Sequence, residues 1–329
     1  MAAPSDILVV AEAADGALAS HNYEVLGLAR RLADGGGGAV AAVLFGEDAN
    51  GLAPDLIAHG ADSVHVADGG AFATYQAEAW LPDLAAIAKE TSPVAILMGH
   101  TAMGADLSPR LAFRLETAVA TGCVEAEISG GRLLLTRPCY GGNGREVTSF
   151  RTTPAIATVK VKSQEPATPD GGRRGDVVAV ASVLDPGDIR VRIVGREAGT
   201  TGSTDLEQAR VIVAGGRGLK SRDGFALAHE LAEVLGGAVG ASRLPCDFGW
   251  CPPSYQIGLS GRIVSPDLYL ALGISGAPQH IAGCASARAI VSVNTDRAAT
   301  IFGHSRFGVI GDCQEVVPAL IAEIRKIKG

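Results

Sequence analysis

The amino-acid sequence predicts an α/β protein in which two domains are each built around a mostly parallel β-sheet. Short apolar runs rich in β-branched residues alternate with segments of helical periodicity at the start of the chain and again after Asp205. Between these regions, Glu197–Thr204 is small, polar and without periodicity, which is typical of a linker. The length of 329 residues also suits two domains. We therefore predict an N-terminal α/β domain over residues 1–204 and a C-terminal domain over residues 205–329.

The first domain begins with strands and helices in alternation, as in βαβ units. Apolar residues recur with helical spacing in the segments between the β-branched runs, as at Val25, Leu26, Ala29 and Leu32. The predicted strands are Ile7–Ala11, Val40–Phe45, Ser63–Val66 and Val94–Met98, and the predicted helices are Asn22–Ala33 and Pro109–Glu116.

The middle of the chain follows a different pattern, in which strands separated by glycine-rich turns replace the helices. Ser163–Gly175 has the composition of an exposed loop. The predicted strands are Gly122–Ile128, Arg132–Thr136, Glu146–Phe150, Ala155–Val161, Val177–Leu184 and Ile189–Val194.

The second domain returns to the α/β pattern. Its predicted strands are Val211–Ala214, Leu268–Leu272, Ile290–Val293 and Phe307–Ile310, and its predicted helices are Phe225–Leu235 and Val316–Ile327.

Composition and charge exclude several classes of protein. A hydrophobic content of 47% excludes intrinsic disorder, and no apolar run approaches the ~20 residues that span a bilayer. The net charge of −7 argues against nucleic acid or an anionic membrane as the main partner. The six cysteines lack C-x-x-C or zinc-ligand spacing, so we expect reduced thiols in a cytoplasmic protein.

Polar or glycine residues follow each apolar run of the second domain. Ligands of parallel sheets bind beyond the carboxyl ends of the strands, so these residues are the candidate site. Glycines would let the backbone approach a diphosphate, and arginines would donate to phosphate or to an electron-rich ring. The segments are Gly215–Gly218, Ser242-Arg243, Ser260-Gly261, Gly273–His280, Asn294–Asp296 and Gly311-Asp312.

Each of these residues also has a purely structural interpretation. Gly215–Gly218 can be a plain turn, Ser275 only a helix cap, His280 a solvated surface histidine and Arg243 a salt-bridge residue. G-x-G-x-x-G is missing, which counts against a nicotinamide-dependent enzyme. The joint placement of the polar residues at successive strand ends favours a dinucleotide site.

Several long segments resemble the electron-transfer flavoprotein alpha subunit. They are VAGGRGLKSRDGF at 213–225, the block at 240–283 that contains GASRLPCDFGWCPPSYQIGLSGR and GISGAPQHIAG, IVSVNTD at 290–296 and FGVIGD at 307–312, together with VVAEAADG and TRPCYGGNG in the first half. The resemblance covers essentially the whole chain. It implies a C-terminal Rossmann-like, parallel-sheet FAD-binding domain and an N-terminal domain that packs with a beta subunit in a heterodimer.

The family resemblance also implies a function. Such a subunit carries electrons from flavoprotein dehydrogenases, such as acyl-CoA dehydrogenases of fatty acid beta-oxidation, to an acceptor such as a membrane quinone reductase. It transforms no substrate of its own and does not insert into the membrane. The alternatives are an electron-bifurcating variant, an NAD-dependent oxidoreductase and a non-redox nucleotide-binding scaffold.

Carried over by position, the resemblance places Arg243 beside the flavin ring, where a cation favours negative charge on the reduced ring and raises the potential. Ser260 would hydrogen-bond near the flavin N5, and His280, beside Gln279, would lie near the C2 carbonyl. The remaining expected FAD contacts are Arg217, Ser242, Gln256, Gly258, Gly261, Gly273, Ser275, Gly276, Asn294, Asp296 and Asp312.

The chain departs from the family pattern at a few of these positions. Leu259 replaces a glutamine, so one polar contact to FAD is lost, and Ser260 replaces a threonine but keeps the hydroxyl. Arg306 stands where an acid is common. Cys246 and Cys284 replace an apolar residue and a methionine, respectively.

Overall fold

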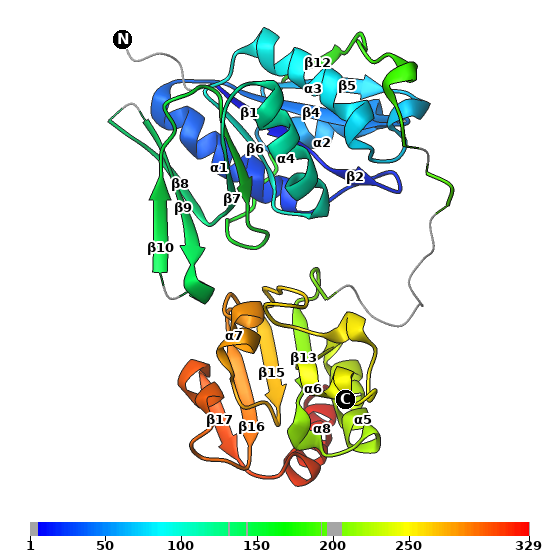
Figure 1. The fold of residues 1–329 in the computed structure, drawn as a ribbon, viewed down its shortest axis with the longest axis vertical. Helices are drawn as coiled ribbons and strands as arrows, with labels where there is room; N and C mark the ends of the chain where they lie inside the picture. The colour runs from blue at the N-terminus through cyan, green and yellow to red at the C-terminus, as the bar shows by residue number, and fades with distance from the viewer. Residues whose placement is uncertain (1–5, 131, 143, 192, 196–205, 329) are drawn as a thin grey trace. The chain divides into compact units, whose positions relative to one another are not determined.

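A computed structural model describes residues 6–130, 132–142, 144–191, 193–195 and 206–328. The chain forms two compact units, one of residues 1–139 and 144–195 and one of residues 140–143 and 196–329 (Figure 1). Each unit contains a parallel sheet with helices against it, so the predicted α/β class is confirmed. The predicted linker Glu197–Thr204 and the boundary at 204/205 lie outside the described residues.

The first unit is built on a seven-stranded parallel sheet with the order β12-β5-β4-β1-β6-β11-β7. Its central strands are buried on both faces, because alternate side chains of β1 enter two different cores: Ile7 and Val9 lie in one, and Leu8 and Val10 in the other. The strands are β1 Ile7–Val10, β4 Val40–Gly46, β5 Ser63–Asp68, β6 Ala95–Gly99, β7 Val119–Cys123, β11 Ala155–Val159 and β12 Asp176–Ala179.

Helices cover both faces of this sheet. Val25 and Leu26 of α1 belong to the same core as Ile7, whereas Trp80 of α3 and Leu107 of α4 belong to the opposite core. The Thr101 hydroxyl accepts a hydrogen bond from Gly104 N at 3.0 Å and so caps α4. The helices are α1 His21–Gly36, α2 Ala53–Ala58, α3 Ala77–Thr91 and α4 Ala102–Arg114.

Smaller strands lie outside the main sheet. The predicted strand Gly122–Ile128 is divided between β7, which ends at Cys123, and β8, and the pairing of β7 with β11 shifts register near Gly122, which has φ 66°. The antiparallel strands are β8 Glu125–Ser129, β9 Arg132–Cys139 and β10 Gly144–Thr148, and a short hairpin comprises β2 Ala13–Ala14 and β3 Ala17–Leu18.

The last two predicted strands before residue 195 differ from the structure. Val177–Leu184 forms a strand only as far as Ala179, where β12 ends, and no strand forms in the described part of 189–194. The Asp83 carboxylate accepts hydrogen bonds from Val183 N at 2.6 Å and Ser182 Oγ at 2.7 Å, so this segment leaves the sheet after β12. The Glu78 carboxylate likewise accepts from Arg190 N at 2.7 Å. Side-chain carboxylates therefore replace strand pairing here, and the described part of 189–194 is irregular.

The second unit is a five-stranded parallel sheet with the order β14-β13-β15-β16-β17. Ser221 caps α5, and Gly236, with φ 69°, ends it. The strands are β13 Val211–Gly215, β14 Ala238–Ala241, β15 Leu268–Leu272, β16 Ile290–Asn294 and β17 Phe307–Ile310, and the helices are α5 Arg222–Leu235, α6 Arg243–Asp247, α7 Pro278–Cys284 and α8 Cys313–Lys328.

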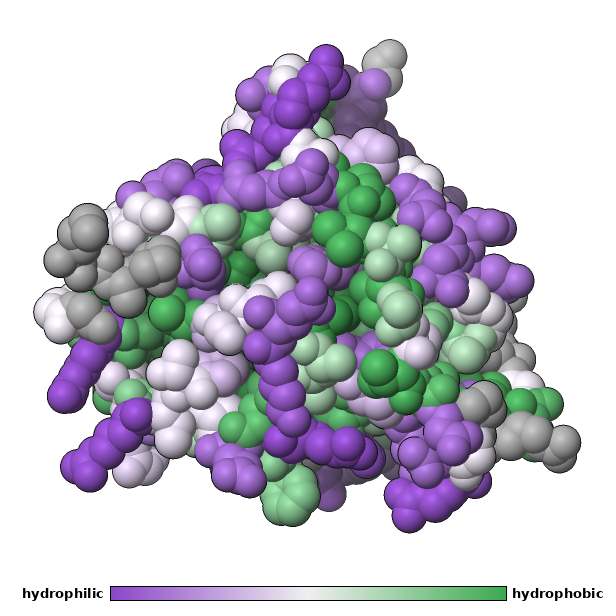
Figure 2. Space-filling view, turned by 90° about the horizontal axis from the view of Figure 1, so that it is seen from above, coloured by the Kyte–Doolittle hydropathy of each residue, from purple (hydrophilic) through white to green (hydrophobic). Residues whose placement is uncertain are grey.

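The surface mixes hydrophilic and hydrophobic residues. In the space-filling view, long hydrophilic side chains project between smaller areas of hydrophobic residues (Figure 2). Within the described ranges, no helix combines the length and the apolar character needed to cross a bilayer.

Candidate functional site

The carboxyl ends of the five parallel strands of the second unit bring the predicted polar segments to one edge. All neighbouring strands run parallel in register, so the loops after them share that edge. Arg217 follows β13, Arg243 follows β14, Ser275 follows β15, Asp296 follows β16 and Asp312 follows β17. The structure therefore places these predicted residues around a single edge of the sheet.

The loops after β13 and β15 are pressed together at the point where the strand order reverses. Gly216 N donates to Leu272 O at 2.8 Å, and Gly218 N donates to Gly273 O at 3.0 Å. A Cβ atom on Gly216 would lie 2.3 Å from Gly273 O. Such a switch point is the usual ligand crevice of an open parallel sheet, and only glycine allows the backbones to meet this closely.

The backbone after β15 presents amide donors at this edge. The Ser275 carbonyl accepts from Ile301 N at 3.0 Å, and the Thr300 hydroxyl bonds to the carbonyls of Ser275 and Gly276 at 2.8 and 2.9 Å. Within the described residues, the N–H groups of Ser275, Gly276 and Ala277 have no acceptor. Successive free N–H groups of this kind suit an anion such as a diphosphate.

Ser275 does not cap a helix, contrary to one of its predicted structural roles. Helix α7 begins two residues later than that role requires, with Ala277 at the cap position and no side-chain cap bond. Ser275 is instead exposed and held through its carbonyl by Thr300, a residue that the sequence analysis missed. Their separation of 25 residues in the sequence leaves no local signal for this contact.

Two arginines at the edge keep their guanidinium groups accessible. The Arg243 side chain is 74% exposed and donates from Nε to Asp247 Oδ2 at 3.2 Å, one turn along α6. Ser242 N donates to Gly215 O at 3.0 Å, which fixes the start of α6 against β13. Arg217 is exposed in the turn after β13. Both guanidinium groups could bind phosphate or an electron-rich ring.

The loop of residues 256–262 lies against α7. Leu259 N donates to Gln279 O at 2.7 Å, and Gln256 Nε2 donates to the Ser260 hydroxyl at 3.0 Å. The backbone of this loop forms only isolated β-bridges, one of them between Ala241 and Gln256. A Cβ atom added to Gly258 or to Gly261 would lie within 3 Å of a nearby backbone atom, so only glycine fits at either position. The loop therefore presents exposed Leu259 and Ser260 at a fixed position.

His280 is buried, so its interpretation as a solvated surface histidine is wrong. The side chain is 7% exposed, and its ring nitrogens lie 2.9 Å from Ile257 O and from the Tyr269 hydroxyl. Burial lowers the pKa of His280 from 6.5 to about 4, so the ring is neutral at neutral pH. Since a carbonyl only accepts, Nδ1 carries the proton and Nε2 accepts from Tyr269. Both ring nitrogens are therefore engaged within the protein.

Three predicted polar residues also have partners within the protein. Asn294 Nδ2 donates to Ile274 O at 2.8 Å, which ties β16 to the loop after β15. The Asp296 carboxylate accepts from Ala298 N at 2.9 Å. Asp312 accepts from Gln314 N at 3.0 Å at the start of α8, and its ion pair with Lys220 lowers the pKa of its carboxyl. Lys220 is a second edge residue that the sequence analysis missed.

An aromatic pair lies on the turn after α6, close in sequence to Arg243. The rings of Phe248 and Trp250 are 5.4 Å apart, and Phe248 is 54% exposed. The sequence analysis did not include either ring among the candidate site residues. The pair could have been found from the spacing of the two aromatics within FGW at 248–250.

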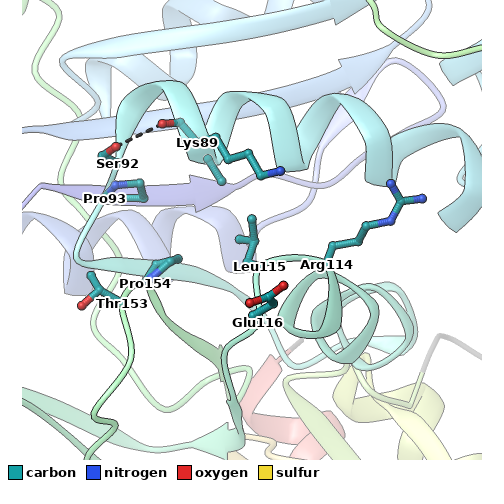
Figure 3. A pocket seen from close by; sticks show the side chains of 9 residues that line it. Lys89, Ser92, Pro93, Arg114, Leu115, Glu116, Thr153 and Pro154 are labelled. Carbon is teal, nitrogen blue, oxygen red and sulfur yellow. Dashed lines mark hydrogen bonds between the residues drawn. The ribbon is translucent and has the colours of Figure 1, made fainter.

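A hollow of ≈ 450 Å³ in the first unit lacks the position at the carboxyl ends of strands that marks the candidate site (Figure 3). Lys89 and Arg114 extend from the ends of α3 and α4, and Pro93 and Pro154 precede β6 and β11. The hollow therefore lies at the amino ends of the strands, away from the edge where parallel sheets bind ligands. Among the described residues, no group of three or more His, Cys, Asp or Glu could hold a metal ion.

Comparison with known proteins decides the family. The model of the electron transfer flavoprotein domain matches residues 7–184, and that of the electron transfer flavoprotein FAD-binding domain matches residues 205–285. The chain belongs to the electron transfer flavoprotein alpha subunits. The alpha subunit of Bacillus subtilis is 39% identical over 98% of both chains, and that of Thermoanaerobacterium thermosaccharolyticum is 41% identical over 98% of both chains.

The match to the FAD-binding domain confirms the predicted cofactor, FAD. As a member of this family, the chain is an electron-transfer subunit. A relative from Anaerotignum propionicum is an acryloyl-CoA reductase electron transfer subunit beta, 32% identical over 98% of this chain and 96% of that protein. The individual FAD contacts remain predictions.

Proposed function

We propose that this chain holds FAD at the carboxyl edge of the β13–β17 sheet and forms a heterodimer with an electron transfer flavoprotein beta subunit. The pair would accept electrons from flavoprotein dehydrogenases, such as acyl-CoA dehydrogenases, and pass them to an acceptor such as a membrane quinone reductase. The observation that carries the proposal is the set of free amide donors at Ser275, Gly276 and Ala277, within a domain of the FAD-binding family.

The donor set at this edge fits FAD. The three amides would hold the diphosphate, with Arg217 close to the same switch point. Arg243 and the Ser260 hydroxyl would meet the ring, and Gln256 orients that hydroxyl through its own hydrogen bond. FAD, when bound, supplies the ability to take up and release electrons singly or in pairs.

The polar residues with internal partners would contribute differently. Asn294 and Asp312 hold in place the loops that would lie at the adenosine side of FAD, and Asp296 shapes the turn after β16. His280 keeps Ile257 and α7 together beneath the loop that carries Ser260. In this arrangement, these side chains would position the site more than they contact the cofactor.

Replacing Arg243 by alanine is expected to lower the reduction potential of the bound FAD. The guanidinium is the cation nearest the ring in this assignment, and positive charge stabilises the extra negative charge of the reduced ring. Spectroelectrochemical titration of the heterodimer measures the midpoint directly.

Two matched variants separate charge from packing. Arg243→Lys keeps the positive charge, so its FAD should have a midpoint potential close to that of the wild type. Arg288→Ala removes an exposed arginine that precedes β16, at the opposite edge of the sheet, and should leave the potential unchanged. If Arg243→Ala and Arg288→Ala give the same midpoint as the wild type, the role of Arg243 is wrong.

Co-expression with the beta subunit tests the proposed function as a whole. The expected product is a yellow heterodimer that transfers electrons from a reduced acyl-CoA dehydrogenase. An electron-bifurcating variant would contain additional flavin and would be reduced by NADH. A colourless chain that binds NADH by itself would instead support the NAD-dependent oxidoreductase.

A further inference from the structure

Cys246 in α6 and Cys251 after the turn that follows α6 form a dithiol pair. Their sulfur atoms are 3.5 Å apart, which is within hydrogen-bonding distance for thiols. All six cysteines are free thiols, and the other four lie elsewhere in the fold without a partner sulfur.

The two thiols differ in their exposure. Cys246 is half-buried, and its sulfur also lies 3.6 Å from Pro252 O. Cys251 is 8% exposed and packs in the core between the sheet, α5 and α8. A small reagent from solvent would therefore reach the sulfur of Cys246 first.

The two thiols also differ in acidity. The hydrogen bond from the Cys251 thiol lowers the pKa of Cys246, whereas the same bond and burial raise the pKa of Cys251 well above its usual value. Burial raises the pKa of Cys123 and Cys313 to about 11 and of Cys284 to about 12. Since the thiolate is the nucleophile, Cys246 is the reactive member of the pair.

We propose that Cys246 and Cys251 are a thiol-oxidation site that reacts with small peroxides. The Cys246 thiolate attacks one peroxide oxygen, the O–O bond breaks, and a sulfenic acid and hydroxide form. The Cys251 thiol then attacks the Cys246 sulfur, a disulfide forms, and the sulfenic oxygen leaves as water. Two thiols are oxidised and one peroxide is reduced in total.

The disulfide would close the turn that carries Phe248 and Trp250. This turn follows α6, which begins at Arg243, and the Cys246 thiol also lies 3.8 Å from Ser242 O. Oxidation would therefore fix the distance between the end of α6 and the residues before Pro252.

Peptide mapping after mild oxidation tests the proposal. Trypsin releases residues 244–262 as one peptide that contains Cys246 and Cys251 and no other cysteine. After treatment of the native full-length protein with hydrogen peroxide and alkylation in denaturant, this peptide should carry no alkyl group and lack two hydrogens. Dithiothreitol should restore both alkylation sites. If both cysteines remain alkylated when Cys139 is already oxidised, the proposal is wrong.

Variants test the role of the partner thiol. In Cys251→Ala, peroxide should leave a sulfenic acid on Cys246 that dimedone traps, and the pH profile of Cys246 alkylation should move to higher pH. Cys139→Ala removes the other half-buried cysteine and should change neither result. An unchanged pH profile in Cys251→Ala would contradict the activation of Cys246 by Cys251.

Discussion

Gly276→Ala is expected to lower the free energy of unfolding of the second unit by about 2–4 kcal/mol and to abolish FAD binding. A Cβ atom at this position would lie 2.2 Å from Ile301 N and 2.6 Å from Ile301 Cα, and both are backbone atoms. The backbone also has φ +86°, which alanine adopts only with strain. Either the loop of residues 299–304 or the amide donors at Ser275–Ala277 must therefore move.

Gly303→Ala is the matched control for this variant. Gly303 belongs to the same loop, but a Cβ atom there meets nothing within 4 Å. Urea unfolding followed by fluorescence, together with the flavin absorbance of the purified heterodimer, should separate the two variants. Equal stability and equal flavin content in both would show that the contact between Gly276 and Ile301 does not shape the site.

Lowering the pH from 7 to 4 is expected to reduce the free energy of unfolding of the second unit by about 3 kcal/mol through protonation of His280 alone. Burial depresses the pKa of this imidazole from 6.5 to about 4, so the unfolded chain takes up the proton first. The stabilisation is thus fully present above pH 6.5, declines as the pH falls and is lost by about pH 4. The buried neutral ring between Ile257 and Tyr269 is the physical cause.

The pH dependence can be measured in the second unit by itself through Trp250. The chain has two tryptophans, and Trp80 lies in a core of the first unit, so a Trp80→Phe parent reports the second unit. In that parent, His280→Gln should flatten the dependence of the urea midpoint on pH between 4 and 6.5. A slope equal to that of the parent would mean that His280 does not remain neutral in the folded protein.

Most elements of the second unit could be predicted from the sequence because most of its strands are short, largely apolar runs between glycine or polar residues. The predicted Leu268–Leu272 matches β15, and the predicted Phe307–Ile310 matches β17. The predicted strand over 189–194 failed because Glu78, more than a hundred residues away, binds its backbone amides. Local pattern carries no information about such a partner.

For the site as well, the sequence predicts which residues lie at the strand ends but not which residues they contact. Because Arg243, Ser275 and Asp312 each follow an apolar run, the sequence alone predicted that they lie at one edge of the sheet. The sequence could not show that Tyr269 buries His280 or that Thr300 holds the carbonyl of Ser275. These contacts depend on how loops from different strands pack together.

The most direct test of the account is amide hydrogen–deuterium exchange of the heterodimer with FAD bound and after FAD is removed. If the three free amides hold the diphosphate, FAD should slow exchange in peptides that contain Ser275–Ala277 and in those that follow β13 and β14. Peptides that line the hollow beside Lys89 and Arg114 should be unaffected. Protection confined to the first unit, with unchanged exchange at Ser275–Ala277, would contradict the assignment of the FAD site.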